Sequence, residues 1–417
     1  MTWCASLEKA TRVAVYAAGL LGAVSATALA QSAAPASEAP KEIRIGVLTD
    51  KSSIFSDLVG DGSVQAAQMA IDDFIAAEKP EFKVSLVSAD HSSKADVASS
   101  IARRWFDQDG VDLIGDVAGA SVALAVSKLA PQYNKVVLVS AAAQNSLTNE
   151  ECLPTVLHWT FNSYGVARTT AREMMKQGKD TWYFMTADYA GGHSLEQDAA
   201  TVVKGAGGKI LGATRHPFNT ADFSSPLLVA QSSGAKVIGL ASAGNDLVTS
   251  IKQANEYGIS KQQTLVGLNV FLLDVHALGL DMAQGMYLTS AFYWDLDEET
   301  RAWARRFFEK RQRMPTMPQA GLYSGVLHYL KAVKAGGTKE AKAVVAKMRE
   351  MPVRDMFARN GKLREDGLME HDLYLFQVKS PAESKYPWDY YSLKQVVPGS
   401  EAFQPLSQST CPHVKKL

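Results

Sequence analysis

Small and polar residues fill four loops that each follow a strand-like segment. The loops read TDKSSIFSD (residues 49–57), GDVAGASV (115–122), SAAAQNS (140–146) and TADYAGGH (186–193). Small side chains let backbone N–H groups approach a bound molecule, and a helix that begins there favours an anion. One such loop is an ordinary strand-to-helix connection. Three of them in one half of the chain, without a catalytic group, predict a binding cleft.

The sequence offers no recognisable catalytic or metal-binding motif. It lacks the G-x-S-x-G, H-E-x-x-H and P-loop patterns, and no two of its eight histidines have metal-site spacing. The glycine-rich stretch at 205–209 follows a helix and precedes a strand, the reverse of a phosphate-binding loop, so we interpret it as a helix end and turn. We therefore predict a protein that is not an enzyme and has no cofactor or bound metal. A secreted hydrolase is disfavoured.

Alternating strands and helices must position these loops. In the first block, predicted strands at 43–50, 82–90, 111–117 and 136–141 alternate with predicted helices at 62–78, 96–108 and 121–133. A second block has strands at 181–188, 209–218, 237–242 and 264–273, with helices at 164–178, 192–207 and 246–258. Such alternation builds parallel sheets with helices on both faces, and ligands bind beyond the carboxyl ends of the strands. The predicted fold class is α/β with two doubly wound lobes.

The last third of the chain has a different pattern. Helices are predicted at 297–312, 318–337 and 338–350. After Met351 short strands return, with a turn pair at 362–367 and an edge strand at 371–379.

The first thirty residues have the layout of a secretory signal peptide. Lys9 and Arg12 precede an apolar run over 13–26, and Ala28-Leu29-Ala30 forms an A-x-A cleavage site. We predict that residues 1–30 are removed on export; a buried N-terminal helix is the alternative. Residues 31–40, rich in Pro, Ala and Ser, are predicted to form a disordered spacer.

The charges of the chain balance, with 43 Lys and Arg residues against 43 Asp and Glu residues. Loss of the signal peptide would leave a single excess acidic residue. This balance argues against a nucleic-acid or anionic-membrane partner. Because no run of roughly 18 apolar residues follows the N-terminal segment, we expect no direct insertion into a membrane.

Two cysteines, Cys152 and Cys411, follow the signal peptide. An oxidising compartment would allow them to pair, and we favour this disulfide over two separate thiols. The bridge would tie the C-terminal tail to a loop in mid-chain. In the chain-entropy model, closing so long a loop constrains the unfolded state by roughly 4 to 5 kcal/mol.

Several segments occur together in a familiar order. They are IRIGVLTD with GDGSVQAAQMAIDDF, VDLIGDVAGASVALAVSKLAP, VVLVSAAAQNSLT, DYAGGHSLEQDAATVVKGAGGKI and DFSSPLLVAQSSGAKVIGLA. With the signal peptide, this ordered set resembles the periplasmic leucine/branched-chain-amino-acid-binding family, the solute receptors of ABC importers. The resemblance covers nearly the whole mature chain.

The resemblance implies the type I periplasmic binding fold, in which three hinge crossings join the two lobes. The crossings would fall near 161–164, 288–292 and 359–366. The N-terminal lobe would comprise 41–162 plus 290–366, and the C-terminal lobe 163–289 plus 367–417. Cys152 would then lie just before the first crossing, where pairing with Cys411 is reasonable. The family also implies a monomer in the periplasm whose partners are a small solute and an inner-membrane ABC permease.

The resemblance further implies which residues hold the ligand. The loops at 118–121 and 141–144 would bind its carboxylate, and Tyr189 of the opposite lobe would cover it. The expected set is Phe55, Gly119, Ala120, Ser121, Ala142, Ala143, Gln144, Tyr189, Asn245 and Asn269.

Two positions depart from the family pattern. Gln144 stands where amino-acid binders have a hydroxyl residue, and Asn269 stands where they have a carboxylate for the ligand ammonium. A buried ammonium without a carboxylate partner is costly. We therefore expect a carboxylate without an ammonium group, aromatic or a 2-oxo acid. Asp188 or Asp246 could restore amino-acid binding, and a ligand sensor of the same fold is a further alternative.

Overall fold

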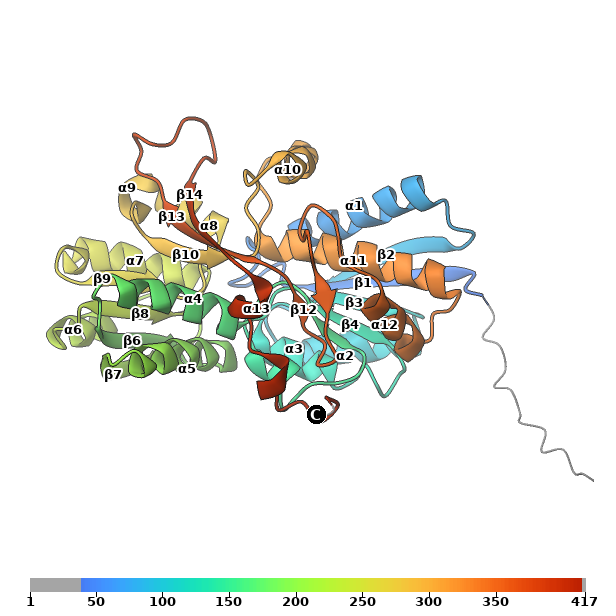
Figure 1. Ribbon diagram of the computed structural model, residues 1–417, viewed down its shortest axis with the longest axis horizontal. Coiled ribbons are helices and arrows are strands. Elements are labelled where there is room, and N and C mark those ends of the chain that lie inside the picture. The colour runs from blue at the N-terminus through green and yellow to red at the C-terminus, as the bar shows by residue number, and fades with distance from the viewer. Residues whose placement is uncertain (1–38, 415–417) are drawn as a thin grey trace, which may run out of the picture. The chain divides into compact units, whose positions relative to one another are not determined.

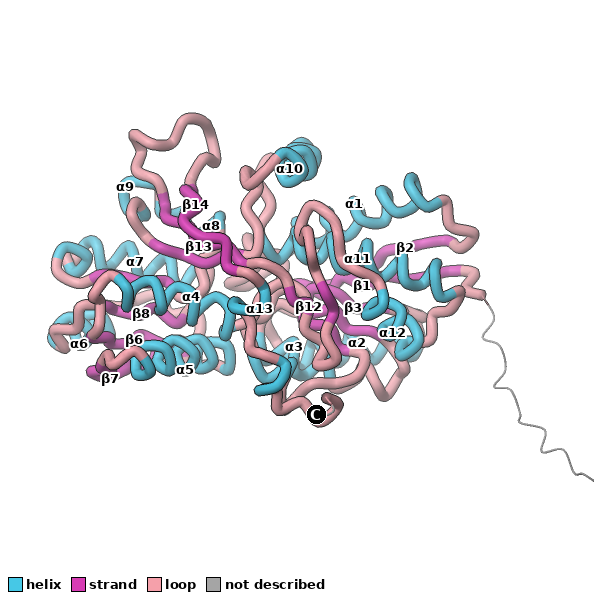
Figure 2. Tube along the Cα trace, in the orientation of Figure 1, coloured by secondary structure: helices cyan, strands magenta, loops and turns pink. Residues whose placement is uncertain are grey.

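The computed structural model describes residues 39–414. Two parallel sheets, each covered by helices on both faces, lie side by side (Figure 1). The first sheet and its helices lie on the right of that view and the second on the left, and Figure 2 shows loops between them. The predicted signal peptide, and residues 31–38 of the predicted spacer, lie outside the described residues.

The first sheet has the strand order β2-β1-β3-β4-β5. Its strands are β1 (Glu42–Thr49), β2 (Lys83–Asp90), β3 (Leu113–Asp116), β4 (Val136–Val139) and β5 (Val156–His158). Its helices are α1 (Gly60–Glu78), α2 (Ala95–Asp107) and α3 (Ala120–Ser127). Trp105 of α2 lies over Gly46 on one face, and Leu322 lies over Gly115 on the other. Both faces are therefore covered, which explains why β3 and β4 are buried, nearly continuous apolar runs.

The second sheet has the order β7-β6-β8-β9. Its strands are β6 (Thr181–Ala187), β7 (Lys209–His216), β8 (Val237–Ala241) and β9 (Thr264–Gly267). Its helices are α4 (Ser163–Lys176), α5 (Ala190–Gly205), α6 (Ser224–Ser232) and α7 (Asn245–Glu256). Every pairing in the two sheets is parallel, as the alternating pattern predicted.

The strand predicted at 264–273 is wrong in its second half. β9 ends at Gly267, and α8 (Leu272–Leu278) begins a few residues later. The Asp274 carboxylate accepts the backbone N–H of Phe271 at 2.9 Å, which fixes the start of that helix. A short apolar run cannot by itself distinguish a strand from a buried helix.

The three helices predicted after residue 296 are present: α10 (Glu298–Arg311), α11 (Met317–Gly336) and α12 (Ala341–Glu350). α11 packs against α1 beside the first sheet (Figure 1). A short hairpin, β11 (Lys362–Leu363) with β12 (Met369–Glu370), follows at the predicted turn pair. Short elements complete the fold: α9 (Leu280–Ala283), α13 (Gly399–Ala402), η1 (Asn145–Thr148), η2 (Ile259–Lys261) and η3 (Leu406–Gln408).

A third sheet is antiparallel, with the order β10-β13-β14. It consists of β10 (Tyr287–Ser290), β13 (Leu373–Val378) and β14 (Tyr391–Val397). β13 was predicted as an edge strand, but it is hydrogen-bonded on both sides. The prediction was wrong because β14, whose middle residues are exposed, was not recognised as a strand.

The chain passes between the lobes after β5, after β10 and after β12. The third passage comes after Leu368, later than the expected 359–366. The cause is that Leu368 bridges His158 of β5, and the His158 N–H donates to the Gly367 carbonyl at 2.8 Å. The β11–β12 hairpin therefore stays with the first sheet.

The C-terminal tail was expected in the second lobe, but its last residues pack on the first. The Asn145 and Asn149 amides both donate to the Gln404 side-chain oxygen, at 3.3 and 3.1 Å. The disulfide between Cys152 and Cys411 is confirmed, with 5.6 Å between the two Cα atoms. The tail thus returns to the loop that precedes the first crossing.

Candidate functional site: a cavity between the lobes

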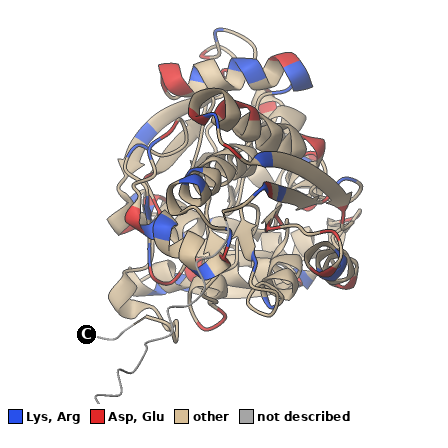
Figure 3. Ribbon diagram, turned by 90° about the vertical axis from the view of Figure 1, so that its right-hand side faces the viewer, with Lys and Arg blue, Asp and Glu red and all other residues tan. Residues whose placement is uncertain are grey.

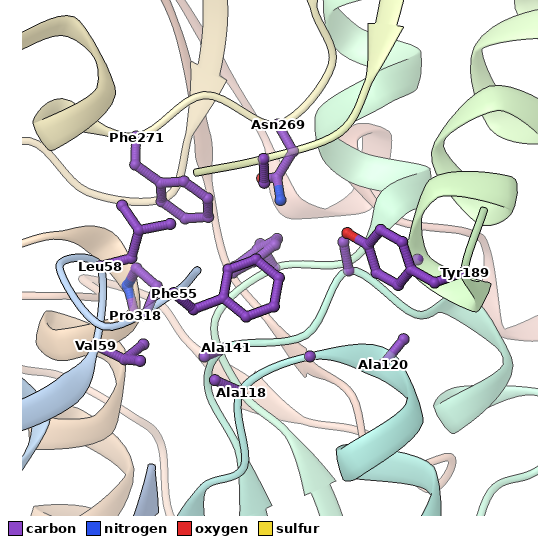
Figure 4. Close-up of a pocket in the computed structure, with 15 residues that line it drawn as sticks. Phe55, Leu58, Val59, Ala118, Ala120, Ala141, Tyr189, Asn269, Phe271 and Pro318 are labelled. Carbon is purple, nitrogen blue, oxygen red and sulfur yellow. The ribbon is translucent and has the colours of Figure 1, made fainter. Parts of the chain in front are cut away.

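A cavity lies where the carboxyl ends of both parallel sheets face each other, with about 390 Å³ of empty space including its mouth. Figure 4 shows the lining residues, which come from both lobes. They are Phe55, Leu58, Val59, Ala118, Gly119, Ala120, Ala141, Ala143, Phe161, Tyr189, Gly191, Ala243, Asn269, Phe271 and Pro318.

The first-lobe wall is largely backbone. Positive φ angles at Asp116 (80°), Val117 (49°) and Gly119 (90°) turn the chain sharply from β3 into α3. The Gly119 N–H donates to the Ala141 carbonyl at 3.0 Å, which joins the loops after β3 and β4. Among the described residues, no side chain caps the start of α3. Because the first N–H groups of a helix have no intrahelical acceptor, this wall carries a partial positive charge.

Two buried aspartates hold this wall in place. The Asp50 carboxylate accepts backbone N–H groups of Ser53 at 2.8 Å and Phe55 at 3.1 Å, which fixes the loop that presents the Phe55 ring. The Asp116 carboxylate accepts the Ser140 hydroxyl at 3.0 Å and so ties the ends of β3 and β4. Complete burial raises the pKa of Asp116 to about 6.

The second-lobe wall contributes the polar side chains. Tyr189 occupies the residue before α5, and burial raises the pKa of its phenol, so the hydroxyl stays protonated. A Cβ on Gly191 would lie 2.7 Å from the Tyr189 ring, so glycine is what lets the ring lie against the helix start. Asn269, in the loop after β9, is 5% exposed, and its Oδ1 has no hydrogen-bond partner among the described residues.

Aromatic rings fill the space between the walls. Phe161 and Phe271 meet edge to face at 5.8 Å between ring centroids. Phe55 of the first lobe meets Phe218 of the second at 5.7 Å, and Tyr189 meets Phe218 at 5.1 Å. None of the described residues that line the cavity is charged. The site therefore suits a ligand whose main part is apolar and preferably aromatic.

Six of the ten expected residues line this cavity: Phe55, Gly119, Ala120, Ala143, Tyr189 and Asn269. Ser121 lines an adjoining pocket together with Ser93 and Phe218. Ala142 is buried, and its carbonyl bonds the His158 ring instead. The other two expected residues lie elsewhere.

Gln144 does not reach the cavity. Its side-chain amide donates to the Ser146 hydroxyl at 2.8 Å, and it lines a separate polar groove with Asn149, His193 and Gln404. Asn245 lies at the start of α7 in another depression, beside Ile54, His276 and Arg313. The chain turns into η1 directly after Gln144, and Gln144 does not line the cavity with the other expected residues.

Apart from Ala118 and Ala141, which lie in the expected loops, the expected set lacks seven lining residues: Leu58, Val59, Phe161, Gly191, Ala243, Phe271 and Pro318. The position of Phe161 at the first expected crossing could have indicated that it lies near the cleft between the lobes. Pro318 begins α11 far along the chain, and nothing in its local sequence points to the cavity.

The two lobes touch beside the cavity. Gly244 has φ of +60°, and a Cβ there would lie 2.7 Å from the Ile54 carbonyl oxygen of the first lobe. The backbones of the two lobes therefore approach closely at this point.

A family profile described as periplasmic binding protein matches residues 42–385. The chain belongs to the periplasmic binding protein family. This periplasmic binding protein is similar to a solved periplasmic binding protein of Burkholderia mallei, with 44% identity, a TM-score of 0.87, and coverage of 90% of this chain and all of that one. The sequence resemblance to the branched-chain-amino-acid-binding family is thereby confirmed.

Two further relatives agree with this assignment. A branched chain amino acid ABC transporter periplasmic ligand-binding protein of Burkholderia xenovorans is 40% identical, with a TM-score of 0.80, covering 89% of this chain and 99% of that one. A Leu/Ile/Val-binding protein homolog of Brucella melitensis is 24% identical over 313 residues, 70% of this chain and 77% of its own length. This periplasmic binding protein is thus an ABC transporter solute-binding protein, whose family implies a small ligand and a membrane permease.

Within residues 39–414, no helix has the length and apolar character needed to cross a membrane. No group of three or more potential metal ligands is gathered in that part of the chain. Lys and Arg segments and Asp and Glu segments are both scattered along the ribbon in Figure 3, in keeping with the balanced charge.

Proposed function

We propose that this periplasmic binding protein captures a small carboxylate without an ammonium group, an aromatic acid or a 2-oxo acid, for an ABC importer. The observation that supports this most is the make-up of the cavity. Aromatic rings and an uncapped helix start line it, and none of its described lining residues is charged.

The carboxylate would bind at the first-lobe wall. The start of α3 and the loop at 141–143 offer backbone N–H groups, and small side chains at Ala118, Ala120 and Ala141 leave room for an anion there. An anion at a helix start is favourable without a cationic side chain.

An ammonium group would find no carboxylate among the described residues that line the cavity. The Asp246 carboxylate already accepts the N–H groups of Asn219 and Thr220, at 3.1 and 2.9 Å. Asp188 is exposed and bonds His193 at 2.8 Å. Because a desolvated ammonium without a partner is costly, a plain α-amino acid fits poorly.

Known ligands of the fold support both the proposal and its alternative. Rhodopseudomonas palustris solute-binding proteins, 17 to 20% identical to this chain, hold 3,4-dihydroxybenzoic acid, benzoate or 4-hydroxybenzoate. The designation of the 40% identical Burkholderia xenovorans relative favours branched-chain amino acids as the second candidate.

Capture would proceed by closure of the two lobes. A ligand that contacts both the α3 wall and the Tyr189 wall stabilises the closed state relative to the open one. The permease would then recognise the closed protein.

The test is calorimetry on protein that has been unfolded, dialysed and refolded to remove any co-purified ligand. The titrants are benzoate, phenylpyruvate, 4-methyl-2-oxopentanoate, phenylalanine and leucine. We expect one of the three acids without an ammonium group to bind at least about tenfold more tightly than either amino acid, since an unpaired charge costs more than 1.4 kcal/mol. Tight leucine binding with no binding of these acids would overturn the proposal.

A further inference from the structure

We infer that the ligand carries a neutral hydroxyl group at the end opposite its carboxylate, and that Asn269 and Tyr189 hold this hydroxyl. The inference rests on the proposed function and narrows its substrate class to hydroxylated aromatic acids. Its starting point is the Asn269 side chain, which lines the cavity and whose buried Oδ1 has no hydrogen-bond partner among the described residues.

The loop that carries Asn269 is pinned on both sides. Before it, the Leu268 N–H donates to the Leu240 carbonyl at 3.1 Å, and after it the Phe271 N–H donates to Asp274 at 2.9 Å. Leu268 and Val270, its immediate neighbours, are each 1% exposed. The side chain of Asn269 therefore has little freedom to turn toward solvent.

A buried acceptor without a donor is rare because it forfeits the hydrogen bonds it made in water. Here the missing donor can come from the ligand, since the same residue lines the cavity that receives it. An apolar ligand end at this point would leave the acceptor unsatisfied.

Tyr189 supplies the complementary group. In Figure 4 its hydroxyl points toward the cavity centre on the same side as Asn269, whereas Ala118 and Ala141 lie across the Phe55 ring. The Tyr189 phenol is protonated and can donate, and the Asn269 Oδ1 can accept. A hydroxyl is the small neutral group that accepts from one and donates to the other.

The ligand would therefore bind in one orientation. The carboxylate lies at the backbone amides of the first lobe, the ring lies between Phe55 and Phe271, and the hydroxyl reaches the second lobe. Such a ligand bridges both lobes with polar contacts at each end, which couples recognition of the hydroxyl to closure.

The experiment compares matched ligand pairs by calorimetry: benzoate with 4-hydroxybenzoate, and phenylacetate with 4-hydroxyphenylacetate. In at least one pair the wild-type protein should bind the hydroxylated acid about 10-fold to 100-fold more tightly, as expected for satisfying a buried polar group. Asn269→Leu should abolish or reverse this preference, and Tyr189→Phe should reduce it. Tyr189→Phe also keeps the test valid if Asn269→Leu does not fold.

Asn255→Leu is the matched control. Asn255 belongs to the same lobe, but its amide bonds the Ile251 carbonyl at 2.9 Å and its oxygen accepts the Ser260 hydroxyl at 2.6 Å, away from the cavity. This variant should keep the wild-type preference.

The outcomes separate the two claims. If the acids bind but the hydroxyl gives no advantage in either pair, or if Asn269→Leu keeps the wild-type preference, the present inference is overturned and the proposed function stands. If no carboxylate without an ammonium binds while amino acids do, the proposed function fails and the inference fails with it.

Discussion

At the residue scale, a substitution at Tyr189 should weaken ligand binding without destabilising the protein. The Tyr189 side chain is half-buried, contacts Phe218 of the same lobe and lines the cavity rather than the core of the second lobe. We expect Tyr189→Ala to raise the Kd for the ligand at least about tenfold, because a ring contact and a hydroxyl are lost together.

The melting temperature of the ligand-free Tyr189→Ala protein should stay within about 2 °C of wild type, since most surface changes cost under about 0.5 kcal/mol. Calorimetry and thermal unfolding provide the two measurements. A parallel loss of stability in the free protein would assign Tyr189 to the core instead.

At the element scale, Asp116 ties the ends of β3 and β4 beneath the cavity. Its pKa is about 6 in the folded protein against an ordinary value of 3.8, because complete burial disfavours the charged form. Between pH 4 and pH 6 the folded state therefore binds more protons than the unfolded state at this residue. The contribution of Asp116 to stability falls as the pH rises through this window.

Asp116→Asn keeps a neutral hydrogen-bonding group and removes that titration. Relative to wild type, the variant should gain up to roughly 3 kcal/mol in its free energy of unfolding between pH 4 and pH 7. Urea denaturation of both proteins at pH 4, 5, 6 and 7 gives the comparison. A stability difference that does not change with pH would refute a raised pKa at Asp116.

The elements also show what the sequence could predict. The strands and helices of the first lobe could be predicted from the spacing of apolar residues and the length of each segment. Their apolar faces pack against neighbouring elements, so the pattern in the sequence matches the burial in the structure. The end of β9 at Gly267 could not be predicted, because the start of the next helix is fixed by the Asp274 carboxylate, which accepts the Phe271 N–H. Gln144 looked like a ligand contact by position, but its own neighbour Ser146 holds the amide. Pro318 reaches the cavity only through the packing of α11, which local pattern does not encode.

At the scale of the whole molecule, the contact between Gly244 and the Ile54 carbonyl limits how far the lobes close. Gly244→Ala would place a Cβ about 2.7 Å from that oxygen, so the closed state should become less favourable. We expect weaker ligand binding, by about tenfold or more, and a larger radius of gyration for the liganded protein in small-angle X-ray scattering.

Gly258→Ala is the control for this change, because Gly258 also has a positive φ (+70°) but its Cβ would meet nothing within 4 Å. Both variants strain the backbone, and only Gly244→Ala adds the contact between lobes. Equal binding losses in the two variants would show that backbone strain, not the contact, is responsible.

The Cys152–Cys411 bridge joins residues that are 259 positions apart, so it closes the chain into a covalent ring. The ring contains the whole second sheet and all three passages between the lobes. A protease that cuts one exposed loop inside this ring opens it without releasing a fragment. Protein nicked once inside the ring should migrate as a single chain until a reductant is added, so a protease must cut twice within residues 152–411, or act on reduced protein, to release a piece from this part of the chain.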